Sequence, residues 1–281
     1  MATTLTDTTL SAVERALAEQ RPPNSQRTSV LTHLVWAPPK WLRMAEQVLA
    51  GMEEGHPSRT VIMTPEPRRK DGLDARVNIV VHEVEDTDRF IAAEVIELRL
   101  KGSRSRAPGS IAVPLLIPDL PAFCRWRGEP AWGSPELEQL ASVVDRLIVD
   151  STEWTGLPGV NRKLAALFDR VAVSDLAWTR TLPWRARLAA LWPGVKRVKK
   201  LEVTGPQAEA LLLAGWLRSL LHRRIELEWR PGKALRRVAV DGTRVEPPTD
   251  DPLSASELLS SQLDVFGRDP IYEAAVRAAT R

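Results

Sequence analysis

The sequence predicts an α/β protein, in part α+β, with an N-terminal domain on a mixed sheet and a smaller C-terminal α/β domain that ends in helices. The chain has 281 residues, and domains of roughly 150 residues favour a division into two. Helical and extended apolar patterns alternate along it, as they do in α/β folds. Three extended segments between residues 60 and 100 follow one another too closely for helical crossovers. Some strands must therefore be antiparallel, and the sheet is mixed.

Local signals give the order of the first elements. Ser11 and Glu14 have the spacing of a capping box, so a helix is expected to begin at Ser11 and run to about residue 20. Pro38-Pro39 opens a second helix, which continues to Met52. β-Branched runs and period-two alternation predict the other elements. These are strands at 28–36, 60–63, 77–81 and 91–100, and an exposed loop at 65–73.

A strand–helix–strand pattern completes the N-terminal domain. Ser134-Pro135-Glu136 supplies a cap, a proline at the first turn and a favourable charge, which predict a helix to about Val144. Strands at 121–127 and 146–150 flank this helix, and such a crossover packs helices on the sheet. The remaining predictions are a helix or irregular crossover at 109–117, a closing helix at 161–168, and a domain that spans residues 1–170.

The C-terminal domain, residues 171–281, is predicted to contain a central helix and a hairpin. Pro206 starts a helix that runs to Leu220 and is apolar around much of its girth, which is typical of a core helix. Alternation at 225–229, the turn Pro231-Gly232 and a strand at 237–240 predict the hairpin. The other expected elements are a helix at 184–191, a strand at 200–204, and terminal helices at 254–265 and from Asp269-Pro270 onward.

Composition and motifs exclude several classes of protein. No apolar run reaches the roughly 18 to 20 residues of a membrane span, and the first ten residues do not look like a secretory signal, so a cytoplasmic protein without a membrane partner is expected. Cys124 is the single cysteine and allows no internal disulfide. The four histidines form no HxxxH or HExxH pair, and GxGxxG, GxxxxGK(S/T) and GxSxG are absent from the sequence. We expect no catalytic residue, no metal and no cofactor.

Positive charge is concentrated in the C-terminal domain. Residues 1–170 hold 21 Lys and Arg against 23 Asp and Glu, a net charge of −2, whereas residues 171–281 hold 18 against 13, a net charge of +5. Residues 176–201 contain seven basic residues and no acidic one, which favours an acidic partner. Tryptophans interleaved with these bases leave open a nucleic-acid-binding module that uses the stretch 178–200. A tryptophan-rich core or a protein interface fits their spacing better, so nucleic acid is not the expected partner.

His56, Ser58 and Arg59 form a second candidate site, for a ligand. They precede a predicted strand, and a histidine, a serine and an arginine together can bind an anion or take part in proton transfer. The alternative is a connector in which Ser58 and Arg59 hydrogen-bond the loop backbone. The first interpretation leaves open a sugar-phosphate-binding protein on an α/β scaffold.

Six segments, in order along the chain, carry a resemblance to a known family. They are Arg27-Thr-Ser-Val-Leu-Thr32, His56-Pro-Ser-Arg-Thr60, Val113-Pro-Leu-Leu-Ile-Pro-Asp-Leu-Pro121, Asp145-Arg-Leu-Ile-Val-Asp-Ser151, Asp175-Leu-Ala-Trp-Thr-Arg180 with Pro183-Trp-Arg185, and Ala210-Leu-Leu-Leu-Ala-Gly-Trp-Leu217. Together they resemble the OpcA family, the glucose-6-phosphate dehydrogenase assembly proteins. The resemblance implies an N-terminal and a C-terminal domain in a non-catalytic protein. Such a protein binds glucose-6-phosphate dehydrogenase, promotes its active oligomer and supports NADPH formation by the oxidative pentose phosphate pathway.

A docking function directs attention to aromatic and arginine side chains in the basic stretch. Trp178, Arg180, Trp184 and Arg185 combine anchoring aromatics with fork-shaped donors, the residue types most enriched in binding hot spots. We predict that these four residues contact the dehydrogenase.

Overall fold

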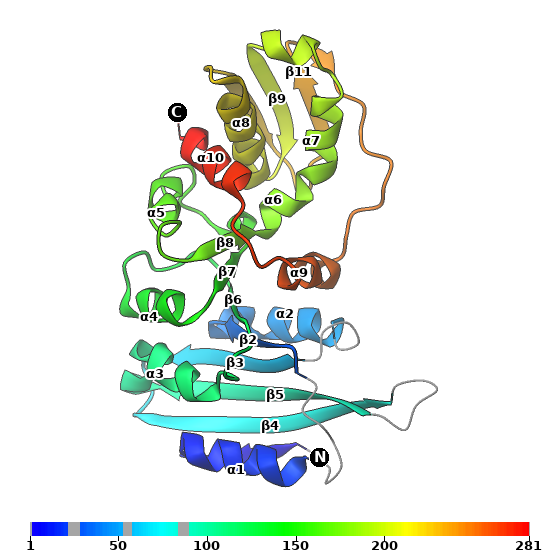
Figure 1. The fold of residues 1–281 in the computed structure, drawn as a ribbon. Helices are drawn as coiled ribbons and strands as arrows, with labels where there is room; N and C mark the ends of the chain where they lie inside the picture. The colour runs from blue at the N-terminus through cyan, green and yellow to red at the C-terminus, as the bar shows by residue number, and fades with distance from the viewer. Residues whose placement is uncertain (1, 22–28, 53–57, 84–89, 281) are drawn as a thin grey trace. The chain divides into compact units, whose positions relative to one another are not determined.

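A computed structural model describes residues 2–21, 29–52, 58–83 and 90–280, with the backbone alone for residues 81–83 and 90–92. The chain divides into two compact units (Figure 1). Unit 1 comprises residues 1–148 and 255–266, and unit 2 comprises residues 149–254 and 267–281. The predicted domain boundary after residue 170 stays a prediction.

The predicted α/β class with a mixed sheet is confirmed. An eight-stranded sheet has the order β1-β4-β5-β3-β2-β6-β7-β8, and a four-stranded sheet has the order β10-β9-β11-β12. The strands are β1 (Thr3–Leu5), β2 (Leu31–Trp36), β3 (Ser58–Glu66), β4 (Gly72–Glu83), β5 (Phe90–Lys101), β6 (Ala122–Trp126), β7 (Arg146–Val149), β8 (Ala172–Asp175), β9 (Lys200–Gly205), β10 (Glu226–Pro231), β11 (Arg237–Val240) and β12 (Thr243–Arg244).

Unit 1 combines parallel and antiparallel pairing. β5, β3, β2, β6 and β7 run parallel, while β4 pairs antiparallel with β5 and β1 antiparallel with β4. The predicted loop at 65–73 is shorter than expected, because β3 continues to Glu66 and β4 begins at Gly72. The helices of unit 1 are α1 (Leu10–Gln20), α2 (Pro39–Ala50), α3 (Pro108–Ala112), α4 (Pro135–Val143) and α9 (Ala255–Leu263), with 3₁₀ turns η1 (Gly102–Arg106) and η2 (Val113–Leu115).

The N-cap of the first helix lies two residues earlier than the capping-box pattern predicts. Thr9 is the N-cap, and its Oγ1 accepts a hydrogen bond from the Ala12 amide at 3.3 Å. Ser11 lies inside α1 and is exposed, so the prediction of Ser11 as the cap is wrong. A threonine hydroxyl serves this role as well as a serine hydroxyl, and spacing alone did not separate the two.

Unit 2 is built around β9. Its helices are α5 (Asn161–Ala165), α6 (Leu176–Arg180), α7 (Leu182–Ala189), α8 (Gln207–Leu221) and α10 (Pro270–Ala279), with 3₁₀ turns η3 (Ser151–Glu153) and η4 (Gly194–Arg197). β8 and α6 are elements that no sequence pattern had predicted. α8 is buried from Ala208 to Leu217, as expected for the core helix of this unit, and its last turn is partly exposed.

The predicted hairpin between 225–229 and 237–240 is wrong, because β9 lies between the two strands. β10 pairs parallel with β9, and β11 pairs antiparallel with β9 on its other side. The loop after Pro231 crosses the end of β9, where a Cβ on Gly205 would meet the Leu235 Cα at 2.9 Å. The glycines therefore permit a close crossing of backbones rather than a tight two-strand turn.

α8 and α10 lie side by side in the core of unit 2 (Figure 1). A Cβ on Gly215 of α8 would meet the Ala275 carbonyl oxygen of α10 at 2.1 Å. The lack of a side chain at Gly215 thus lets the backbones of α8 and α10 come into direct contact. No helix among the described residues is long and apolar enough to cross a membrane.

Candidate functional site

The basic stretch predicted as a contact site folds as two consecutive helices of unit 2. Asp175 ends β8 and caps α6, because its Oδ1 accepts a hydrogen bond from the Ala177 amide at 2.9 Å. Thr181 then connects α6 to α7, and its Oγ1 donates to the Trp178 carbonyl at 2.7 Å. The short link fixes the directions of both helices, and with them the four predicted contact residues.

Both predicted tryptophans lie inside unit 2. Trp178 and Trp184 are only 6% and 5% exposed. The Trp178 indole Nε1 donates to the Asp269 Oδ2 at 2.8 Å, and its ring lies 5.8 Å from the Tyr272 ring, centroid to centroid. Trp178 therefore joins α6 to α10. Whether these tryptophans contribute to a partner interface stays a prediction.

The two predicted arginines are each held by a specific neighbour. Arg180 forms a two-pronged ion pair with Asp150: Nη1 lies 3.0 Å from Oδ1, and Nη2 lies 2.5 Å from Oδ2. The Arg185 guanidinium carbon stacks 3.5 Å from the centre of the Trp178 ring, and its Nε donates to the Thr181 Oγ1 at 3.1 Å. Burial lowers the pKa of Arg185 to about 10, against the opposing effect of Asp269.

Arg180 is surrounded by three carboxylates, Asp150, Asp175 and Glu209, which we call the carboxylate cluster. Burial, reinforced by Asp150, raises the pKa of Asp175 to about 6. Burial also raises the pKa of Glu209 to about 7, although Arg180, 3.9 Å from its Oε1, acts in the opposite direction. The Tyr272 hydroxyl donates to the Asp175 Oδ2 at 3.4 Å. One guanidinium thus faces three acids, and the cluster retains protons near neutral pH.

The carboxylate cluster is chemically suited to holding elements together. Its groups come from the ends of β7 and β8 and from the first turn of α8, and Arg180 joins them from α6. Within the described part of the chain, no group of three or more His, Cys, Asp or Glu side chains is arranged to hold a metal ion.

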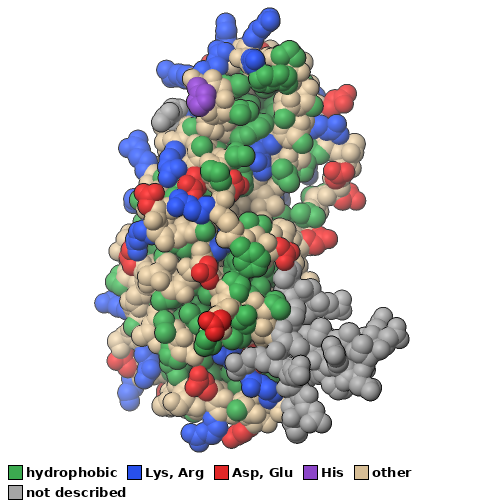
Figure 2. Space-filling model, in the orientation of Figure 1, with side chains coloured by type: hydrophobic (Ala, Val, Ile, Leu, Met, Phe, Trp, Pro, Cys, Tyr) green, Lys and Arg blue, Asp and Glu red, His purple; other side chains and the backbone are tan. Residues whose placement is uncertain are grey.

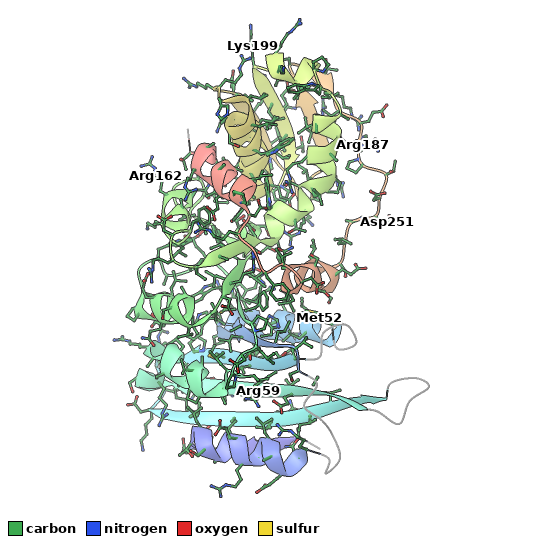
Figure 3. All side chains as sticks on the ribbon, in the orientation of Figure 1. Met52, Arg59, Arg162, Arg187, Lys199 and Asp251 are labelled. Atoms are coloured by element: carbon green, nitrogen blue, oxygen red, sulfur yellow. The ribbon has the colours of Figure 1, made fainter. Side chains whose placement is uncertain are left out.

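Exposed apolar side chains, missed by the sequence-based choice of contact residues, occur along the segment from α7 to η4. They are Leu182, Leu191 and Trp192, and together with Lys196 we call them the α7 face. Trp192 is 57% exposed, and the Lys196 Nζ lies 4.1 Å from the centre of its ring. Arg187 on α7 and Lys199 before β9 add charge to the same stretch (Figure 3). The sequence Trp192-Pro193-Gly194 could have indicated an exposed tryptophan, because a proline and a glycine mark the end of a helix at the surface.

The second predicted site does not bring its described residues together. Ser58 and Arg59 are neighbours on β3, and successive strand side chains point to opposite faces of a sheet. Ser58 lines a cavity of about 200 Å³ together with His33 and Thr60. Arg59 instead donates to the Glu94 Oε2 at 2.6 Å and to the Leu115 carbonyl at 3.0 Å (Figure 3). His56 lies outside the described residues.

The environment of Arg59 favours a structural role. Burial would raise the Glu94 pKa, but hydrogen bonds and charge from Arg59 and Arg21 outweigh it and lower that pKa. Arg59 is 5% exposed, and its guanidinium is committed to Glu94 and to the Leu115 carbonyl at the end of η2. Both the connector interpretation and a ligand-binding role for this site stay predictions.

Comparisons with known proteins match both parts of the chain to one family. Residues 50–167 match a family model described as the glucose-6-phosphate dehydrogenase subunit N-terminal domain. Residues 171–276 match a model described as the C-terminal domain of the same subunit. A search of curated proteins found no match.

Proposed function

The chain belongs to the OpcA family of glucose-6-phosphate dehydrogenase assembly proteins, and from this premise we propose that it binds glucose-6-phosphate dehydrogenase and promotes the enzyme's active oligomer. The observation that carries the proposal is that both family domains are present, in order, in one chain. The protein acts as a non-catalytic accessory in the cytoplasm and supports NADPH supply through the oxidative pentose phosphate pathway.

Thermodynamic linkage between binding of this protein and assembly of the dehydrogenase supplies the mechanism of activation. A protein that binds the assembled dehydrogenase more tightly than the dissociated enzyme shifts the population toward the assembled form. A tenfold preference corresponds to about 1.4 kcal/mol, which is enough to change the measured activity. The effect on activity therefore saturates as the accessory protein fills its sites on the enzyme, and it does not require a reactive group on the accessory protein.

The α7 face is the part of unit 2 that we propose contacts the dehydrogenase. Trp192 offers a large exposed aromatic surface, and Lys196 stacks on it, so the pair combines apolar area with charge. The four residues predicted from the sequence lie in α6 and α7, which precede Trp192 in the chain. Trp178 and Trp184 are buried in unit 2, while Arg180 and Arg185 are half-buried.

A binding measurement with one variant and one control tests this surface. Trp192→Ala should weaken binding of the dehydrogenase by about tenfold or more in calorimetry, because hot-spot tryptophans contribute about 2 kcal/mol or more. Phe266→Ala removes an exposed aromatic of unit 1 and should bind like the unaltered protein. Equal affinities of both variants would exclude the α7 face, and absence of binding by the unaltered protein would exclude the function itself.

A further inference from the structure

A groove in unit 2 is lined by basic side chains and lies where α8 and α10 end. It has a volume of about 820 Å³. The basic side chains that line it are Arg218, His222, Arg223, Arg224 and Arg277, and we call this cavity the arginine groove. None of the described residues that line it is an Asp or a Glu. On the face shown in Figure 2, Lys and Arg side chains outnumber acidic ones in the upper part of unit 2, which contains α8 and α10.

The local chain fixes this concentration of charge. α8 ends at His222, which adopts a left-handed conformation with φ of 50° and turns the chain away from the helix axis. Arg223 and Arg224 follow and are exposed at the rim of the groove. Arg218 lies one turn earlier, where its guanidinium donates to the Ile225 carbonyl at 2.8 and 2.9 Å. Arg218 is thus held in place, with its charge partly buried.

The cations of the groove are poorly neutralised by the described residues. Burial and the charge of Arg224 both lower the pKa of Arg218. Arg277 has carboxylates nearby, Glu273 at 3.4 Å and Asp169 at 3.9 Å. Neither Arg223 nor Arg224 forms an ion pair with a described carboxylate. Like charges held together at a concave surface favour the capture of an anion from solution.

A purely structural interpretation accounts for only part of the lining. Arg218 satisfies carbonyls at the end of α10, since its Nη1 lies 3.4 Å from the Ala278 oxygen and 3.3 Å from the Ala279 oxygen. Positive side chains at helix C-termini also complement the helix dipole. The side chain of Arg224, however, has no hydrogen bond to any described residue, so stabilisation of the helix ends does not explain its presence beside Arg218.

We propose that the arginine groove binds a phosphorylated small molecule and that its occupancy adjusts the affinity of the α7 face for the dehydrogenase. The guanidinium fork matches phosphate oxygens, and the volume lies within the range of small-ligand pockets. Nucleic acid would need a basic track longer than one groove. The link to the α7 face is Arg223, whose Nη1 donates to the Lys196 carbonyl at 3.0 Å, and Lys196 stacks on Trp192. Only this coupling rests on the proposed function.

Binding is tested on the full chain without the dehydrogenase. Calorimetry at low ionic strength would use inorganic pyrophosphate, glucose 6-phosphate and NADP⁺ as probes, which separate a general phosphate site from sugar-phosphate and nucleotide sites. The double variant Arg223→Ala/Arg224→Ala should raise the dissociation constant by about tenfold or more. Arg236→Ala/Arg237→Ala removes two exposed arginines outside the groove and should leave binding unchanged.

Three results would overturn the proposal. They are no heat of binding for any probe, equal weakening in both double variants, and a groove variant that loses binding to an oligonucleotide while no small phosphate binds. Coupling is tested separately, by measuring the affinity for the dehydrogenase with and without the best probe. If the probe leaves the affinity for the dehydrogenase unaltered, only the proposed coupling is wrong. If the protein binds phosphate but not the dehydrogenase, the proposed function is wrong, and the proposal that the arginine groove binds phosphate still holds.

Discussion

At the scale of single residues, unit 2 contains acids that are buried with too little positive charge to ionise all of them. Glu209 and Asp175 have raised pKa values because burial penalises their charged forms, and Arg180 is already paired with Asp150. A carboxyl whose pKa is higher in the folded protein than in the unfolded chain stabilises the fold when protonated. That contribution is present below the unfolded pKa and is lost as the pH rises through the folded value.

Glu209→Gln should therefore flatten the dependence of stability on pH. Between pH 5 and pH 8 the unaltered protein passes through the Glu209 pKa of about 7 and loses part of its free energy of unfolding. The neutral glutamine loses nothing in that interval, so the variant should gain roughly 1 to 3 kcal/mol on the unaltered protein at the upper end. Denaturant titrations at several pH values measure this difference. Glu226→Gln, at an exposed glutamate of β10, is the control. Identical slopes for the Glu209 variant and the unaltered protein would contradict the prediction.

Residue types were easier to predict than residue environments. The tryptophans and arginines were predicted as contacts for a partner, which stays a prediction, and the structure places Trp178 and Arg185 in one stacked pair. Burial of Trp178 depends on α10, 91 positions later in the chain, whose Asp269 accepts its indole proton. No local pattern contains that information. Trp192, by contrast, lies in the segment between α7 and η4 and is 57% exposed.

At the scale of elements, strong local signals predicted most helices. The main errors concerned which strands pair with each other. Pro39, Pro135 and Pro270 do begin α2, α4 and α10. The hairpin failed because strand pairing is decided by β9, which is distant in sequence from β11 and provides a more favourable partner on each side. β8 was missed because Ala172–Asp175 contains only two apolar residues, followed by Ser174 and Asp175, and shows no extended apolar or alternating pattern.

The cap of α1 gives a direct test of a corrected boundary. Thr9→Ala removes the hydroxyl that accepts from the Ala12 amide and should cost about 1 kcal/mol of stability. Ser11→Ala changes an exposed side chain within the helix and should have little effect. Thermal unfolding of the two variants checks the assignment. A larger loss from Ser11→Ala than from Thr9→Ala would return the cap to Ser11.

The contact between α8 and α10 predicts a larger effect. Gly215→Ala places a methyl group where the Ala275 carbonyl oxygen stands, so the two helices must move apart. The expected cost is roughly 1 to 3 kcal/mol, the usual range for overpacking a core. Gly194→Ala, at a glycine with open space around its added Cβ, serves as the matched control. Equal melting temperatures of the two variants would show that the helices are not in backbone contact.

At the scale of the whole molecule, short sequence motifs were enough to identify the family. Which unit each segment of the chain belongs to could be seen only in the structure. Both family domains match, in the order that the resemblance implied. The C-terminal segment, however, contributes α9 to unit 1 and α10 to unit 2. The Ser256 Oγ of α9 donates to the Val48 carbonyl of α2 at 2.8 Å, across 208 positions of the sequence. Contacts between such distant residues are decided by packing, which composition and periodicity do not report.

Size-exclusion chromatography with light scattering, combined with activity assays, tests the central claim most directly. The dehydrogenase would be titrated with increasing amounts of this protein at a concentration where the enzyme is partly dissociated. The account predicts a complex that contains both proteins, a rising share of assembled enzyme and a parallel, saturating rise in activity. An unchanged mass distribution and unchanged activity at every ratio would contradict it.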